Sequence, residues 1–547
     1  MPVAALPLPI LALAAGAAIS RLAGRRFPVI AQPVAAAAIW VAAILLAAEW
    51  ALLRAPLTAS FLDLGDGARL AIRLDAAAFA VGILILVPLA MVTTFRRVTT
   101  PALTALTAAA GLLVIQAAGL LLAALALGLT LNLVALHLVL SGCERAPGFR
   151  VVADASWLAA TWAGAALWGV AGTAQFAAIP LSALTAPIFT LVAIAAVLTA
   201  GLVPWRPWTA AMWERCGPAT AAVPILLVPP LGFNLLLRVY EAGGGRYPSP
   251  AFNAGLAALG ALVAIASGLR AQAAVTRVSL MAELVPAGSG FTLMALSLGT
   301  PLGVAAGLCS LAATSLLAVL LPLTSASDGS TFALLALAAG APPTLVFAAR
   351  LLAVQAALEG GATATLVAVA GTLAWILGLA ASGRGLRLPA GPMVRPGGAA
   401  VAGFALAGLL LVAGGALVGV LLVAVAVPAA AAVTTVPGGT ISALPAAVDT
   451  ASGRWPAVAL GGVGLVITVA VVAAARSWRP PPALNPAPYF GPVWAESANR
   501  IVSMANRLEV PAEFRVTNWQ LLERALAAGR LWPWIAISAA LAVILLR

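Results

Sequence analysis

The chain has 547 residues, of which 63% are hydrophobic and only 8% are charged, so its composition excludes an ordinary water-soluble domain and indicates a polytopic membrane protein. Its net charge of +13 comes from 29 basic residues, all arginine, against 16 acidic ones. In a soluble protein such an excess would suggest nucleic acid, but in a membrane protein it is typical of short cytoplasmic loops. We therefore expect the lipid bilayer, and no nucleic acid, among its partners.

The sequence offers no set of side chains for a metal ion or a redox cofactor. His137 is the single histidine, and the cysteines Cys143, Cys216 and Cys309 stand far apart in or near apolar runs. We expect these cysteines to act as small hydrophobic residues, with neither metal-ligand spacing nor a disulfide framework. No glycine-rich phosphate loop is present. We predict no catalytic residue, no metal site and no cofactor in this chain.

About 16 apolar runs are long enough to cross a membrane, or about 14 if weak neighbours merge. The runs lie at 3–20, 28–53, 76–95, 101–121, 122–142, 152–176, 182–203, 219–239, 251–270, 284–300, 302–323, 331–358, 363–381, 399–428, 455–476 and 531–546. The first run has no basic residue before it, which favours a retained helix over a signal peptide.

Arginine placement predicts the orientation of these runs. Loops after odd-numbered runs hold most arginines: Arg21, Arg25, Arg26, Arg96, Arg97, Arg145, Arg150, Arg206, Arg215, Arg277, Arg384, Arg387, Arg395 and Arg479. The positive-inside rule then places the N-terminus outside and the loop 204–218 in the cytoplasm.

Two polar segments interrupt the apolar pattern. Segment 54–75 alternates polar and apolar residues and predicts a short extracytoplasmic hairpin before the third run. Segment 477–530 begins with a proline run and then places apolar residues on one side of a possible helix, which predicts an amphipathic surface helix. A solvated linker is the alternative for this second segment. A terminal spanning helix at 531–547 would follow it.

The stretch from Thr199 to Tyr240 contains the most informative interruption. An apolar run ends at Pro204, a tryptophan-rich polar segment follows, and Pro218 opens the next run. Within a membrane, broken backbone survives only where protein or internal water satisfies it, so a break is a candidate working site. An ordinary loop between two spanning helices is the alternative.

This stretch resembles the antiporter-like membrane subunits of respiratory complex I, membrane-bound hydrogenases and multisubunit cation/proton antiporters. Their motif, similar to K-A-G-L-V-P-L-H-x-W, is matched by 199–208, with Thr199 in place of the lysine and Arg206 in place of the histidine. The antiporter-like subunit of the hydrogenase-4 (formate hydrogenlyase) type is the most similar branch. The resemblance implies an all-α protein with two inverted five-helix repeats and broken helices, an antiporter-like core at 101–381 between N-terminal helices at 1–100 and C-terminal helices at 382–476.

The resemblance also implies a proton relay, and this chain departs from it at each step. No acidic residue matches the glutamate of the fifth helix, where His137 is either a packing histidine or a relay group. The central helix has Ser310, Thr314 and Ala318 at its polar positions, and alanine carries no proton.

Besides Thr199, Arg206 and His137, three charged residues are candidates for the ion pathway. Arg277 lies in a segment similar to A-Q-x-D-L-K-R-L, and Glu283 is either a buried proton site or an acid paired with Arg277. Arg350 follows Pro342-Pro343, two prolines that predict a kinked helix, at the position of a lysine or glutamate. Since arginine stays protonated, we expect it to neutralise a carboxylate, from Glu283, Glu359 or a neighbouring subunit, or to face a water-filled cavity.

We therefore predict a multi-pass subunit of the bacterial inner (plasma) membrane. Its partners would be the other membrane subunits of a respiratory or hydrogenase-type complex, within which it would be at most a non-redox subunit. Proton or cation translocation follows from the resemblance but is expected to be impaired. A purely structural scaffold subunit and an independent small-molecule or ion carrier are the alternatives.

Overall fold

The computed structural model describes residues 5–455, apart from 54, 64–68, 144–145, 203–207, 325–327, 360–361, 386, 390–396, 435–441, 445–446 and 451–452. It also describes five residues between 462 and 473. The predicted surface segment 477–530 and the terminal helix 531–547 lie outside the described residues. So do Pro204 and Arg206.

The described chain is a bundle of helices, which confirms the all-α membrane class. In chain order they are α1 (Leu8–Arg26), α2 (Pro28–Leu53), α3 (Ala76–Phe95), α4 (Pro101–Gln116), α5 (Leu120–Leu140), α6 (Ala146–Ala171), α7 (Ala186–Thr199), α8 (Trp208–Arg215), α9 (Pro218–Ala242), α10 (Pro250–Ala273), α11 (Arg277–Leu296), α12 (Pro301–Leu323), α13 (Asp328–Ala339), α14 (Leu345–Glu359), α15 (Ala362–Gly385), α16 (Gly398–Ala416), α17 (Val418–Leu421), the π-helix η4 (Leu422–Ala426) and α18 (Val427–Val433). Two short 3₁₀ helices, η2 (Phe176–Ala178) and η3 (Leu181–Ala183), precede α7. Ten of the described helices are long and apolar enough to cross a membrane.

Several helices begin where local chemistry dictates. Pro101, Pro218, Pro250 and Pro301 are each the first residue of a helix. Proline suits this position because the first turn leaves its N–H groups without intrahelical partners. Pro218 therefore marks the start of α9, as the sequence predicts.

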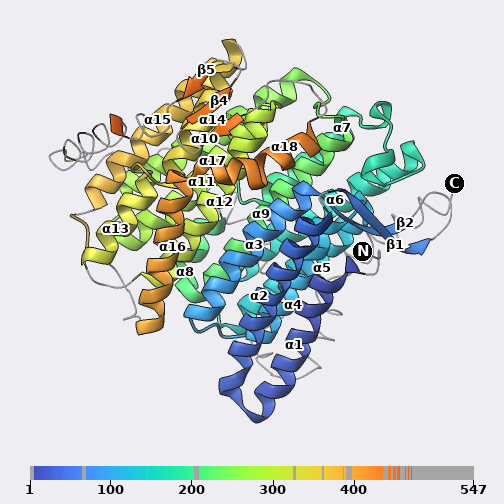
Figure 1. Ribbon diagram of the computed structural model, residues 1–547, viewed down its shortest axis with the longest axis horizontal. Helices are drawn as coiled ribbons and strands as arrows, with labels where there is room; N and C mark the ends of the chain where they lie inside the picture. Colours follow the sequence, from blue (N-terminus) through green and yellow to red (C-terminus); the bar gives the residue numbers. More distant parts are fainter. Residues whose placement is uncertain are drawn as a thin grey trace.

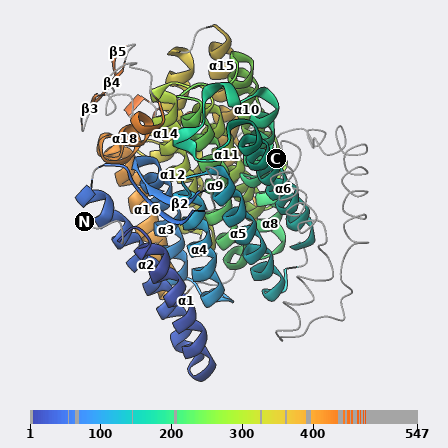
Figure 2. The ribbon, with the colours of Figure 1, turned by 90° about the vertical axis from the view of Figure 1, so that its right-hand side faces the viewer.

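The core of the bundle lies around α9, α11 and α12 (Figure 1). Every residue in the apolar stretch of α9 is buried, against 28% in the corresponding stretches of α1 and α16. Helices α1 and α2 lie side by side at one end of the bundle (Figure 2). Their exposed leucines, isoleucines and valines form a surface suited to lipid.

Segment 54–75 contains two antiparallel strands, β1 (Leu57–Asp63) and β2 (Arg69–Leu74). Leu57 pairs with Leu74, so the end of α2 lies next to the start of α3. A further bridge joins Ile72 to Ala117, just after α4. The ends of α2 and α4 therefore meet at the N-terminal end of α3. A second, three-stranded sheet consists of β3 (Ser442–Leu444), β4 (Ala447–Thr450) and β5 (Gly453–Trp455).

Two predicted spans are broken into shorter helices. Helix α7 has 14 residues, about 21 Å, which is less than the roughly 30 Å of a bilayer core. The segment after it contains the short, buried helix α8, so the described part of 204–218 is helical. The predicted run 331–358 is likewise divided into α13 and α14 at Pro342-Pro343.

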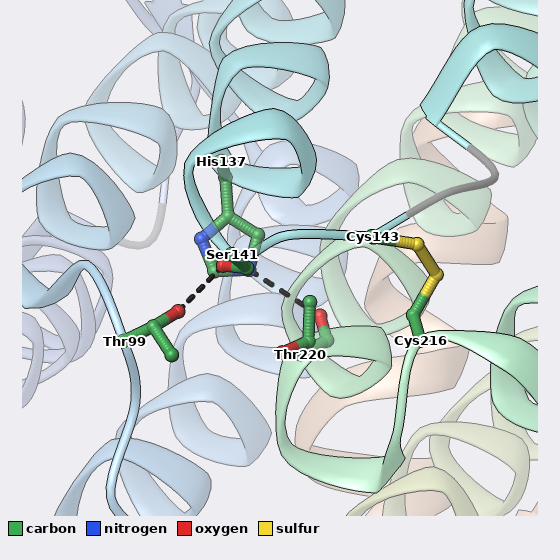
Figure 3. The surroundings of a disulfide bond; sticks show 6 residues. All are labelled: Thr99, His137, Ser141, Cys143, Cys216 and Thr220. Atoms are coloured by element: carbon green, nitrogen blue, oxygen red, sulfur yellow. Dashed lines mark hydrogen bonds between the residues drawn. A yellow bond between two sulfur atoms is a disulfide. The ribbon is translucent and has the colours of Figure 1, made fainter. Parts of the chain in front are cut away.

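A disulfide joins Cys143 to Cys216, so our expectation of three unpaired cysteines is wrong. Cys143 follows α5 and Cys216 precedes α9, with a Cα–Cα distance of 5.0 Å. Figure 3 shows the bond linking the loop after α5 to the turn before α9. The 73-residue separation hides the pairing from sequence inspection, because the packing of α5 against α9 creates it. Cys309 is a free, buried cysteine, as expected.

Candidate ion-translocation site

The first helix break lies at the C-terminal end of α7. Gly201 has a φ of +73°, a conformation that glycine adopts without strain. The N–H of Leu202 donates to the carbonyl of Val197 at 3.0 Å, and the indole of Trp208 donates to the carbonyl of Leu198 at 3.2 Å. This arrangement satisfies carbonyl groups that the end of a helix leaves without partners. Among the residues described at the first break, the groups that close it are neutral.

Thr199 occupies the position at which the resemblance places a lysine. Its hydroxyl is buried and donates to the carbonyl of Ala195 at 2.7 Å. The hydroxyl of Ser156 on α6 contacts both the Thr199 hydroxyl and the Ala195 carbonyl, the latter at 3.0 Å, so the two hydroxyl hydrogens are shared among these three contacts. Both hydroxyls thus contact the backbone of α7, and neither gains or loses a proton at physiological pH.

His137 is fully buried near the C-terminal end of α5. One ring nitrogen, Nδ1, lies 2.6 Å from the Thr100 hydroxyl, and Nε2 lies 3.3 Å from the carbonyl of Thr220. Figure 3 shows the imidazole directed toward Thr220 in the first turn of α9. Both nitrogens have partners, so the geometry fits a packing histidine that joins three helices.

The second helix break lies at the C-terminal end of α13 and is closed by a charge. Arg350 of α14 is 3% exposed, and its Nη1 and Nη2 donate to the carbonyls of Ala339 and Ala338 at 2.8 and 3.3 Å. Its guanidinium lies 5.2 Å from the ring centroid of Phe291. A cation at the C-terminal end of a helix is stabilised by the unpaired carbonyls and by the helix dipole.

Neither Glu283 nor Glu359 is the partner of Arg350, so that expectation is wrong. Among the described residues its guanidinium contacts no carboxylate, because the broken end of α13 supplies backbone oxygens instead. A cavity of about 10 Å³ adjoins this break, but only apolar side chains line it, among them Leu334 and Ala338. Such a lining gives water in this cavity too few hydrogen-bond partners.

Glu283 and Arg277 lie on α11 but have separate contacts. The carboxylate of Glu283 pairs with Arg270 of α10 at 2.9 Å, a partner that the sequence pattern did not indicate. Arg277 donates from Nε to the carbonyl of Gly385 at 3.2 Å, which ties the start of α11 to the end of α15. Glu359 accepts a bond from Gln355 at 3.2 Å. The candidate charges are thus distributed over several local contacts.

The central helix α12 carries hydroxyls that bond to helix backbone. Ser310 donates to the carbonyl of Gly288 at 3.3 Å and accepts from Thr292 at 3.1 Å. Thr314 donates to the carbonyl of Ser310 at 2.8 Å, and Ala318 is buried with no polar group. These contacts hold α11 against α12 without a titratable side chain.

Sequence reasoning missed a four-residue charge network at the start of α3. Arg238 of α9 forms two bonds with Asp75, at 2.6 and 2.9 Å, and a third with Glu241 at 2.7 Å. Arg73 reaches Asp75 at 2.9 Å and Glu241 at 2.7 Å. The Arg73-Leu74-Asp75 and Leu-Leu-Arg-Val motifs are each visible in the sequence, but nothing there pairs them. Only the packing of α3 against α9 brings them together.

Asp75 holds this network and also caps α3. One of its oxygens accepts the N–H of Ala78 at 2.8 Å, which satisfies the first turn of the helix. Burial alone would raise the pKa of Asp75, but the positive charges and hydrogen bonds of Arg238 and Arg73 outweigh it and lower the pKa to about 2. The carboxylate therefore stays ionised at neutral pH. Its contacts join the hairpin, α3 and α9.

Comparisons with known proteins identify this fold through solved structures. No protein-family model matches the sequence, and no curated protein matches it by sequence. A chain of the Mrp complex from Dietzia sp. is similar with a TM-score of 0.74 and 19% identity, over 99% of this chain and 63% of that one. The present chain therefore spans less than two thirds of the Mrp chain.

Two further complexes contain the same architecture. A chain of the membrane-bound sulfane sulfur reductase, an archaeal respiratory membrane complex, matches with a TM-score of 0.75 and 17% identity, over 98% of this chain and all of that one. A chain of respiratory complex I from Thermus thermophilus matches with a TM-score of 0.66 and 20% identity, over 79% of this chain and all of that one. This chain therefore shares its fold with membrane chains of these three complexes.

Proposed function

We propose that this chain is an antiporter-like membrane-arm subunit of a larger complex in the bacterial plasma membrane, where it supports the assembly more than it conducts protons. The similar chains are parts of an Mrp complex, a sulfane sulfur reductase and a complex I. Their common setting supports membrane subunits as partners. The motif at 199–208 favours a hydrogenase-type complex among such assemblies.

The single observation that carries the proposal is the contact of Arg350 with the end of α13. A relay group must gain and lose a proton, whereas a guanidinium stays charged and makes a fixed counter-charge. Here both of its terminal nitrogens are bonded to helix carbonyls. Its position favours a role in closing the break, and the hydroxyls of Thr199 and Ser310 leave the neighbouring steps without titratable groups.

The test compares proton flux and assembly in the same preparation. The complex that contains this chain is purified with either native Arg350 or Arg350→Ala, reconstituted in vesicles, and assayed for substrate-driven proton uptake. We expect Arg350→Ala to reduce the amount of assembled complex, while the flux per assembled complex stays within about twofold of native.

Arg246→Ala is the matched control, because Arg246 is exposed in the turn after α9 and the same charge is removed. It should leave both assembly and flux unchanged. If Arg350→Ala assembles normally but loses the proton flux attributable to this subunit, a proton route uses Arg350 and the structural role is refuted.

A further inference from the structure

Glu49 is a buried acidic residue that does not correspond to any position of the proton relay implied by the resemblance. It lies on α2, is 5% exposed, and neither of its carboxylate oxygens has a hydrogen-bond partner within the described part of the chain. A buried charge inside a spanning helix is costly unless another group neutralises it. Glu49 therefore requires a positive partner that the neighbouring described side chains do not supply.

Two buried carboxamide side chains also lack hydrogen-bond partners. Gln116 at the end of α4 and Asn234 on α9 are both fully buried. The nitrogen and the oxygen of each carboxamide are without a hydrogen-bond partner among the described residues. Buried amides are nearly always hydrogen-bonded or bound to a ligand, so three such side chains together need a common explanation.

Packing brings Glu49 and Gln116 to the same place. Leu46 of α2 and Leu112 of α4 both press on Gly82 of α3, where they lie 2.7 and 3.5 Å from the position that a Cβ would take. Glu49 is three residues after Leu46, and Gln116 is four residues after Leu112. Each is therefore one turn further along the same helix face. Since α2 and α4 both end beside the start of α3, the two side chains flank its first turns.

Asn234 approaches the same turns from α9. It lies on the helix face that carries Leu227, which packs 3.2 Å from the Cβ position of Gly111 on α4. One turn after Asn234, Arg238 reaches Asp75 at the start of α3. Asn234 is thus positioned between α4 and the first turns of α3.

The residues of α3 at this place are mostly small and uncharged. The first seven residues of α3, AAAFAVG, include four alanines and one glycine. Among the described residues, the charges at the start of α3 are Asp75, Arg238, Arg73 and Glu241, which are engaged with one another in the network above. Helix α1, which packs on α2 and α4, has its charged residues at its opposite, C-terminal end.

We propose that Glu49, Gln116 and Asn234 form a binding site for a monovalent cation next to the start of α3. A carboxylate and two amide oxygens are ligands for hard cations, and one carboxylate balances one positive charge. A divalent ion would leave an excess charge in an apolar interior. A proton would neutralise Glu49 but would leave the two carboxamides without partners. The site is separate from the helix breaks, so it stands independently of the proposed function.

The test measures ion binding to the full chain in its purified complex. Radiolabelled sodium and radiolabelled rubidium, a potassium analogue, are used in separate arms, with choline holding the ionic strength constant. We expect the native complex to bind roughly one ion per copy of the chain, with the preferred ion raising the unfolding midpoint. Glu49→Gln should abolish this binding while keeping the side-chain shape, and Glu359→Gln is the control that should retain it.

Two further variants test the neutral ligands. Gln116→Leu and Asn234→Leu keep the carboxylate and should each weaken the binding of the preferred ion about tenfold. If the native complex binds no more sodium or rubidium than Glu49→Gln does, the carboxylate is neutralised by a proton and the proposed site is wrong. Unchanged affinity in both leucine variants would likewise overturn it.

Discussion

The breaks after α7 and after α13 end in the same backbone arrangement. Gly201 and Gly340 have φ angles of +73° and +77°. In each case the next residue donates its N–H to the carbonyl five positions earlier, from Leu202 to Val197 at 3.0 Å and from Ala341 to Ala336 at 3.2 Å. This bond and a left-handed glycine define a common helix ending.

The two breaks differ in the side chain that closes them. Trp208 supplies a neutral indole N–H at the first break, whereas Arg350 supplies a permanent charge at the second. Glycine and the following backbone thus suffice to end a helix inside the protein, and the charge is a separate addition.

The largest difference in the free energy of unfolding is expected between substitutions of Arg350 and of Trp208, the side chains that close the two breaks. Arg350→Ala leaves two buried carbonyls and a cavity, so we expect a loss of about 3 kcal/mol or more in the free energy of unfolding. Trp208→Phe keeps the ring contact with Phe149 and removes one neutral hydrogen bond, with an expected loss of about 1 kcal/mol. Denaturation of the purified complex measures both, and equal losses would contradict the distinction.

Replacement of the two glycines should give intermediate and similar effects. Alanine in the left-handed region costs roughly 1–2 kcal/mol, so Gly201→Ala and Gly340→Ala should each lower the unfolding midpoint by a comparable amount. Asparagine tolerates this conformation better and should lose less at either position. Gly255 of α10 has open space around its Cβ position, so Gly255→Ala is a control without such strain. A neutral result at only one break would show that the two are not equivalent.

A change of pH is expected to have the smallest effect on the stability of the two breaks. Thr199 and Trp208 stay neutral, and Arg350 stays charged, between about pH 5 and 9. Asp75 behaves differently, since its pKa is lowered from 3.8 to about 2 in the folded protein. The stabilisation from a lowered pKa is present above the unfolded value and is lost as the pH falls through the folded value. The unfolding midpoint should therefore fall between about pH 4 and 2, and Asp75→Asn should flatten that limb. A steep acid limb that persists in Asp75→Asn would assign it to other groups.

The apolar runs predicted the helices well because hydrophobic length and proline starts are local properties. Pro218 and the division near Pro342-Pro343 were visible for the same reason. The partners of Arg350 were not visible, since backbone carbonyls carry no sequence signal. Helix α8 was hidden because its 8 residues are too few to show a periodic pattern.

The remaining contacts that the sequence did not predict join residues that are far apart in the chain. Arg238 and Asp75 are 163 residues apart, and only the packing of α9 on α3 joins them. Glu49 did carry a signal, because an acid within the apolar run 28–53 is unusual on its own. The convergence with Gln116 and Asn234 required the positions of four helices.

The redox state of Cys143 and Cys216 in cells indicates which side of the membrane these two residues face. Both residues lie in segments that the arginine pattern assigns to the cytoplasm, where thiols are normally kept reduced. A bond that persists in living cells would require that face to meet an oxidising compartment, which reverses the assigned topology. A pair of free thiols in cells would agree with the arginines, and the crosslink would then form only after the protein leaves its native surroundings.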